Sequence, residues 1–109
     1  MLILAREDLV AALLGLMVEV AGFEPKFAGG DEPVADAIAE KRPQAVLIDC
    51  DHPDLDEGLV GLLRNSSARP ILFSAFRKQG EVSTLATRYG TESFTLPVES
   101  ATFTQILRR

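Results

Sequence analysis

Short apolar runs alternate with segments whose apolar residues recur every three or four positions. This alternation occurs five times along the chain. The short runs are expected to be strands at 2–4, 26–28, 45–49, 71–73 and 93–96. Strands that alternate with helices favour a parallel sheet with right-handed crossovers and helices on both faces. We therefore predict an α/β fold, a doubly wound (βα)5 sheet with strand order 2-1-3-4-5, as one domain over residues 1–109.

Each helical segment predicts a core-facing side. In the first helix, which begins near Glu7, the expected core residues are Leu9, Leu13, Leu16 (or Met17) and Val20. Gly22 is expected to end this helix in a left-handed conformation, and 29–31 is expected to be a turn. The expected core residues of the later helices are Val34, Ala37 and Ile38; Leu59, Leu62 and Leu63; Val82, Leu85, Ala86 and Tyr89; and Phe103, Ile106 and Leu107. Gly90 is expected to close the fourth helix, and Ser100 to cap the fifth.

The composition is that of one small globular domain. A chain of 109 residues with 47% apolar and 25% charged content can bury a core without a metal or a disulfide. Its net charge of −5 argues against direct nucleic-acid binding, which needs clustered Lys and Arg. The single Cys50 excludes an internal disulfide and fits a reducing compartment. No apolar run approaches the length of a membrane span, so we expect a cytoplasmic domain.

An acidic cluster follows the most apolar strand. The run 46–48 stops at Asp49, and Asp51, Asp54 and Asp56 follow within seven positions. The carboxyl end of a buried strand is where open α/β sheets bind ligands. Asp49 is therefore a candidate functional residue, although a carboxylate at this place can also simply cap a turn.

With Pro53 four positions after Asp49, this stretch resembles the phospho-acceptor strand of the receiver (CheY-like) domains of two-component systems. The resemblance extends to Gly22-Phe23 after the first helix, Ser74-Ala75 after the fourth strand, and Pro97. It implies a CheY-like, flavodoxin-like fold. It also implies that Asp49 is a candidate phospho-acceptor and that Ser74 and Phe94 are switch-like residues.

Two features of the family's active site are missing. Ala5 and Arg6 stand where receivers carry the acidic pair that holds Mg²⁺, and Leu96 stands where they carry a Lys. We therefore expect no metal site, no cofactor and no enzyme activity. The expected pseudo-active site consists of Arg6, Asp49, Asp51, Ser74 and Leu96, with the Arg6 guanidinium paired with Asp49 or Asp51.

The residues that follow Asp49 have simpler explanations than catalysis or metal binding. His52 is expected to be a surface residue, and the surrounding carboxylates are expected to raise the pKa of Cys50. A metal cluster of Asp49, Asp51, His52 and Asp54 is disfavoured, because consecutive loop residues seldom converge on one ion.

Three functions can be compared. The first is a pseudo-receiver, a signalling module that binds a kinase, an effector domain or a second copy without Mg²⁺-dependent phosphorylation. Its expected contact surface is helix four, strand five and helix five, with Val82, Thr87, Phe94 and Thr95 and the rim charges Arg88, Arg108 and Arg109. The second is a receiver that accepts a phosphoryl group on Asp49 from a histidine kinase. A flavodoxin-like cofactor binder is disfavoured, because no Gly-rich phosphate loop follows the first strand.

Overall fold

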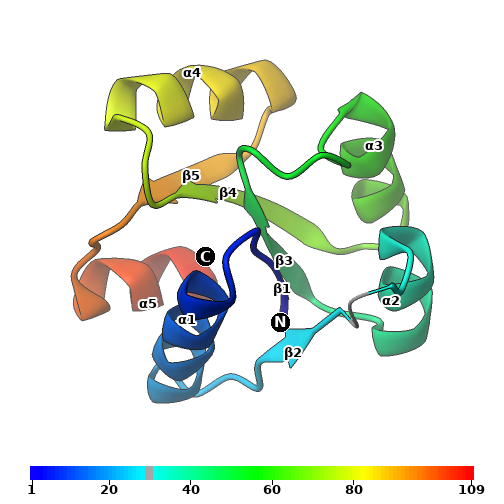
Figure 1. The fold of residues 1–109 in the computed structure, drawn as a ribbon, viewed down its shortest axis with the longest axis horizontal. Coiled ribbons are helices and arrows are strands. Elements are labelled where there is room, and N and C mark those ends of the chain that lie inside the picture. The colour runs from blue at the N-terminus through cyan, green and yellow to red at the C-terminus, as the bar shows by residue number, and fades with distance from the viewer. Residues whose placement is uncertain (29–30) are drawn as a thin grey trace.

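A computed structural model describes residues 1–28 and 31–109, and these contain the predicted succession of strands and helices (Figure 1). The strands are β1 (Leu2–Leu4), β2 (Lys26–Phe27), β3 (Ala45–Asp49), β4 (Arg69–Ser74) and β5 (Glu92–Thr95). The helices are α1 (Asp8–Val20), α2 (Val34–Lys41), α3 (Glu57–Asn65), α4 (Gln79–Tyr89) and α5 (Ser100–Arg108). Of the turn predicted at 29–31, residues 29 and 30 lie outside the described residues.

The sheet has the predicted topology. Its strands are all parallel and lie in the order β2-β1-β3-β4-β5, which confirms the doubly wound architecture. The central strand β3 is buried at every position, as its continuous apolar run predicts. All carboxyl ends meet at one edge of the sheet, and this edge carries Asp49.

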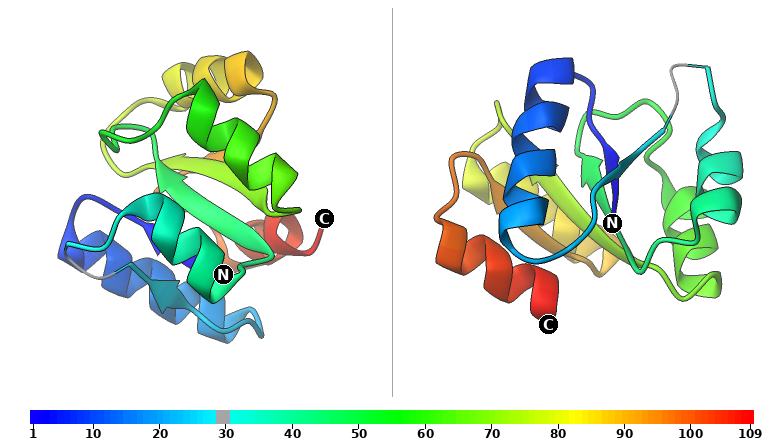
Figure 2. Two further views of the ribbon diagram at one scale, coloured as in Figure 1. Left: turned by 90° about the vertical axis from the view of Figure 1, so that its right-hand side faces the viewer. Right: turned by 90° about the horizontal axis from the view of Figure 1, so that it is seen from below.

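Helices cover both faces of the sheet. α1 and α5 lie on one face, and α2, α3 and α4 lie on the other; Figure 2 shows these layers from two further directions. The first face has an aromatic core in which the Phe94 ring stacks on Phe73 at 5.7 Å and meets Phe103 edge-on at 5.3 Å. This aromatic cluster joins β4 and β5 to α5 on that face of the sheet.

The ends of the helices mostly follow the sequence signals. Gly22 and Gly90 adopt the left-handed conformation, with φ of 94° and 67°, as expected of residues that end helices. Ser100 is the first residue of α5, not its cap; Glu99 takes that position without a side-chain hydrogen bond. Leu62 was expected in the core but is exposed, and Val60 is buried in its place on α3.

The orientation predicted for α1 was wrong. Four residues expected to face the core are exposed: Leu9 (83%), Leu13 (47%), Leu16 (63%) and Val20 (80%). Met17, the alternative to Leu16, is half-buried and packs against the core. The buried side of the helix consists of Leu14, Gly15 and Val18.

The sequence of α1 is apolar on almost every side, so its periodicity does not single out one face. The buried side is the one that carries Gly15. A Cβ at Gly15 would lie 2.8 Å from the Phe27 ring, so a larger residue there would require this ring to shift.

Candidate functional site

The candidate site lies at the carboxyl ends of β1, β3 and β4. Leu4 pairs with Ile48 in the parallel register, so the next positions along these neighbouring strands are Ala5 and Asp49. On the other side of β3, Asp49 pairs with Phe73, and Ser74 follows. The sheet thus places Asp49 between Ala5, which was expected to stand in place of a metal ligand, and Ser74, which was expected to act as a switch.

Asp49 is held in a turn of its own. The residue is only 6% exposed, and its Oδ1 accepts a hydrogen bond from the backbone amide of Asp51 at 2.9 Å. Asp49 thus caps a turn, as the simpler explanation of the sequence proposed. Its second carboxylate oxygen has no hydrogen-bond partner within residues 1–28 and 31–109 and remains available to a ligand.

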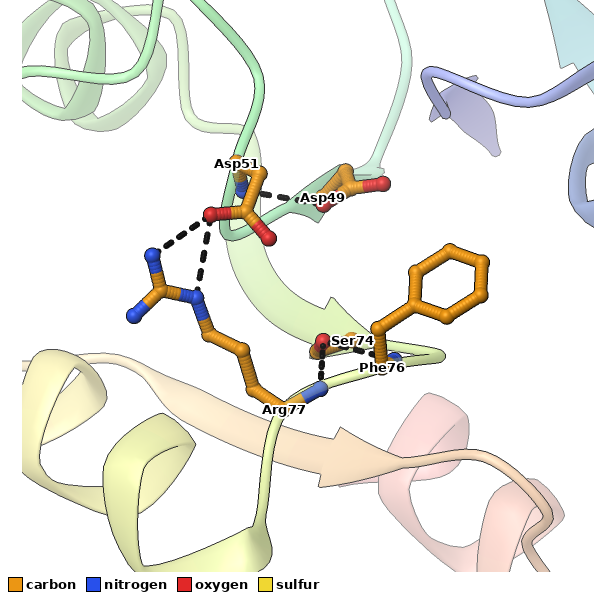
Figure 3. Close-up of polar contacts among 5 residues, drawn as sticks. All are labelled: Asp49, Asp51, Ser74, Phe76 and Arg77. Atoms are coloured by element: carbon orange, nitrogen blue, oxygen red, sulfur yellow. Dashed lines mark hydrogen bonds and ion pairs between the residues drawn. The ribbon is translucent and has the colours of Figure 1, made fainter.

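Asp51 is bound by Arg77 from the loop after β4 (Figure 3). The guanidinium Nε and Nη2 both donate to Asp51 Oδ1, at 3.0 and 2.6 Å. This hydrogen bonding, against a smaller effect of burial, holds the carboxyl pKa of Asp51 below its usual value. The same pair raises the pKa of Arg77. The positive charge paired with this acidic edge therefore comes from the loop after β4, the neighbour of β3.

Ser74 sets the path of the loop that carries Arg77. Its side chain is almost fully buried, and its Oγ accepts hydrogen bonds from the amides of Phe76 and Arg77, at 3.2 and 2.9 Å. A serine hydroxyl that binds the amides two and three residues later stabilises a tight turn. Figure 3 shows the Arg77 side chain leaving this turn toward Asp51, whereas the Phe76 ring lies on the other side of Ser74. Phe76 is largely exposed.

The predicted pairing of Arg6 with Asp49 or Asp51 was wrong. Arg6 is exposed, and among the described residues the ion pair of Asp51 is made by Arg77. Arg6 has only a long-range effect: its charge contributes less than Arg77 to lowering the pKa of Asp51. The reason is its position in the bend before α1, from which its flexible side chain extends into solvent.

Leu96 follows β5 and brings no charge to the site. Its amide donates to the carbonyl of Ser74 at 2.9 Å, and its half-buried side chain packs against the aromatic core. Phe94, expected on a contact surface, is buried in that core, and so is Val82 on the opposite side. Both were misplaced because strand β5 and helix α4 turn these side chains toward the sheet.

The remaining candidates are Cys50, His52 and the possible metal cluster around them. Burial, followed by the charges of Asp49 and Asp51, raises the pKa of the Cys50 thiol to about 11, as its acidic neighbours predict. His52 is half-buried, and its Nδ1 accepts the amide of Asp54 at 3.1 Å. Within the described part of the chain, no group of three or more His, Cys, Asp or Glu side chains is placed to hold a metal ion.

Arg77 was not found by sequence reasoning. Two signals pointed to it: it follows Ser74 by three residues, and β4 is the predicted neighbour of β3. An arginine after either neighbouring strand has the length to reach Asp51, so the sequence offered both Arg6 and Arg77. The turn made by Ser74 decides between them, and it is a feature of the folded loop.

The strand order and the alternation of strands and helices are those of the receiver fold, and solved structures of receiver domains superpose on this chain. No known family model matches the sequence, and no curated protein matches it. The signal receiver domain of a modulated diguanylate cyclase from Desulfovibrio desulfuricans G20 superposes with a TM-score of 0.75 at 22% identity, covering 98% of this chain and 88% of that chain.

Two further receiver domains are similar. One, from a sensor histidine kinase of Pseudomonas aeruginosa PAO1 with magnesium coordinated in its active-site cleft, has a TM-score of 0.75 at 20% identity, covering 99% of this chain and 93% of that chain. The other, from a DNA-binding response regulator of Colwellia psychrerythraea 34H, has a TM-score of 0.73 at 17% identity, covering 99% and 97%. At these identities the likeness is one of fold. Within the described residues, no helix is both long and apolar enough to span a bilayer.

Proposed function

We propose that this domain is a pseudo-receiver: a signalling module of the receiver fold that acts by binding a protein, without Mg²⁺-dependent phosphorylation. The observation that carries the proposal is the residue beside Asp49. The register of β1 and β3 puts Ala5 there, and the next residue, Arg6, is exposed and positively charged. A hard divalent cation needs oxygen ligands, and neither side chain supplies one.

The charges around Asp49 support the same proposal. Phosphoryl transfer depends on cations that neutralise the charge developing on the phosphoryl oxygens. Leu96 provides no such charge, and the Arg77 guanidinium is already bound to Asp51. A metal ion entering here would have to displace Arg77 or bind against its positive charge.

For the contact surface we propose the side formed by α4, β5 and α5. Its exposed residues include Thr87, Arg88 and Arg108, and Thr95 is half-buried at its edge. Arg109 is fixed at the rim by a 2.8 Å hydrogen bond to Glu92. This surface can take a kinase, an effector domain or a second copy as its partner, in the cytoplasm.

A phosphorylatable receiver is the second candidate function. The unpartnered oxygen of Asp49, at the carboxyl end of β3 and next to Ser74, favours it. Without the metal and the lysine, acylphosphate formation would be slower by about 10³-fold or more, by comparison with single cations in similar sites.

Intact-mass measurement after incubation with acetyl phosphate and Mg²⁺ tests the proposal. We expect no mass gain of one phosphoryl group for the wild type, and none for Asp49→Asn. The triple variant Ala5→Asp, Arg6→Asp, Leu96→Lys is the positive control and should gain the group. A gain by the wild type that Asp49→Asn abolishes would establish the second candidate instead.

A further inference from the structure

A hollow lies at the amino ends of the strands, at the edge of the sheet away from the acidic cluster. It has a volume of about 280 Å³ and is bounded by the start of β1, the loop before β2 and the loop after α2. Its charged side chains are Lys26, Arg42 and Glu24, and Phe23 and Gln44 also line it. Small-molecule sites have volumes of about 300–1,000 Å³, so this hollow has room for a small organic ligand.

Lys26 and Arg42 bring positive charge to the hollow that no carboxylate of the described chain neutralises. Lys41 forms an ion pair with Glu32 at 3.0 Å, but none of the ion pairs among the described residues involves Lys26 or Arg42. The Lys26 ammonium donates to the carbonyl of Lys41, the last residue of α2, at 3.4 Å. An ammonium has three donors, so Lys26 keeps others for a ligand.

Arg42 has a backbone conformation that does not suit an arginine. It is the C-cap of α2, with φ of 44° and ψ of 56° in the left-handed region. Glycine or asparagine usually takes such a position, because other side chains clash with their own backbone there. Gly22 and Gly90 have the left-handed conformation near the ends of α1 and α4. An arginine at a strained backbone position indicates a function of its side chain.

The wider charge pattern favours an anion at this edge, although the chain as a whole carries −5. The helices that connect parallel strands begin at the carboxyl edge of the sheet and end at the amino edge. The first turns of α1 to α4 are acidic, with Asp8, Asp36, Glu57 and Glu81. The last turns of α2 to α5 are basic, with Lys41, Arg64, Arg88 and Arg108.

This separation of charge attracts anions to the amino edge. The carbonyl ends of the helices offset part of the attraction, so the cations at the hollow itself supply most of it.

We propose that the hollow of Lys26 and Arg42 binds the phosphate group of a small organic phosphate ester. A guanidinium can donate two parallel hydrogen bonds to phosphate oxygens, and an ammonium adds a compact charge. A phosphate monoester carries about −1.5 to −2 near pH 7, which matches two cations. The hollow is larger than a phosphate group, and Phe23 offers an apolar wall to the organic part. The proposal does not depend on the proposed signalling function.

Phenyl phosphate, which joins a phosphate group to an apolar ring, is the probe. Titration followed by nuclear magnetic resonance should shift the amide signals of Lys26, Arg42 and Gln44, with a dissociation constant of about 1 mM or below. At constant ionic strength, inorganic phosphate, which lacks the ring, should bind more weakly, and so should benzoate, which carries a single charge. Phenol, which carries no charge at neutral pH, should not bind.

Arg42→Gly separates binding from folding. Glycine relieves the left-handed conformation, so this variant should unfold at a higher urea concentration than the wild type. It should nevertheless bind phenyl phosphate about fivefold or more weakly, because it lacks the guanidinium. Lys26→Gln should also weaken binding. Glu24→Gln should strengthen it, because it removes the carboxylate that repels the ligand.

The matched control is Arg88→Gln, which removes a positive charge from the end of α4 and should bind like the wild type. Arg42 also lines a second hollow with Ser66, so Ser66→Ala should leave binding unchanged if the ligand occupies the first hollow. Asp49→Asn should leave it unchanged as well, which distinguishes this site from the acidic edge.

Absence of binding by the wild type would overturn the proposal, and so would equal binding of benzoate and phenyl phosphate. Equal losses in Arg42→Gly and Arg88→Gln would overturn it too, because they would indicate a general charge effect. Weaker binding by Ser66→Ala or Asp49→Asn would place the ligand elsewhere and contradict this site. None of these outcomes bears on the phosphorylation assay.

Discussion

Arg77 binds Asp51 through two nitrogens that share one carboxylate oxygen, and so joins the loop after β4 to the turn after β3. The pair leaves Asp49 outside it, although Asp49 is the more deeply buried carboxylate. The loop after β4 is thus linked to the acidic edge by this ion pair and by the turn that the Ser74 hydroxyl closes.

Replacing Arg77 should raise the carboxyl pKa of Asp51 toward its ordinary value, because the hydrogen bonds of the guanidinium are the main cause of the lowering. Arg6→Ala is the matched control and should shift this pKa much less. Nuclear magnetic resonance titration of the Asp51 carboxyl carbon measures both. A larger shift in Arg6→Ala than in Arg77→Ala would contradict the geometry.

The same pair has a consequence for stability against acid. Because the folded pKa of Asp51 lies below the ordinary value of 3.8, the pair stabilises the domain above that pH. The stabilisation is lost as the pH falls through the folded pKa. Urea unfolding at several pH values should therefore show a steeper loss of stability below pH 3.8 for the wild type than for Arg77→Ala.

Magnesium binding should be gained by restoring the acidic pair. We expect calorimetry to detect no saturable binding by the wild type at millimolar Mg²⁺, and clear binding by Ala5→Asp with Arg6→Asp. The two carboxylates would add oxygen ligands next to Asp49. Adding Asp49→Asn to this variant should weaken the binding again. Saturation by the wild type would show that other oxygens hold the ion.

Cys50 should react slowly with alkylating reagents. With its pKa near 11, about one thiol in a thousand is ionised at pH 8, and the thiolate is the reactive form. Iodoacetamide should therefore modify the folded domain at least about tenfold more slowly than the urea-unfolded chain. Asp51→Asn should raise the rate only slightly, because burial is the main cause of the shift. Equal rates in the folded and unfolded states would contradict the burial of this thiol.

Two helical glycines should respond differently to alanine. Gly61 of α3 has no atom within 4 Å of an added Cβ, so Gly61→Ala should stabilise the domain by about 0.5–1 kcal/mol through helix propensity. Gly15→Ala gains the same propensity but must displace the Phe27 ring, so we expect a net loss of about 1 kcal/mol. Urea unfolding compares the two. Equal stabilisation would mean that Phe27 does not restrain α1.

The fold was predictable because each local signal supported the same topology. The apolar run 46–48 specified a central buried strand, and Gly22 and Gly90 marked the ends of their helices. The position of Asp49 at the edge followed directly, since it requires only the end of one strand and the order of the sheet.

The orientation of α1 and the ion-pair partner of Asp51 could not be predicted from local sequence signals. A helix with leucines on opposite sides can bury either side, and periodicity does not show that the side with Gly15 lies against Phe27 of β2. The choice between Arg6 and Arg77 depends on a loop turn closed by the buried hydroxyl of Ser74. The orientation of α1 and the pairing of Arg77 with Asp51 both involve contacts between segments that are distant in the sequence. The hydrophobic periodicity of each single segment does not contain these contacts.

The missing side chain at position 15 also lets α1 lie close against the Phe27 ring of β2. This contact is on the inner side of the helix, and Leu9, Leu13 and Leu16 are exposed on the outer side. A larger residue at position 15 would have to displace the Phe27 ring or move this side of α1 away from β2. An interior glycine thus contributes to which apolar side chains the protein exposes to its surroundings.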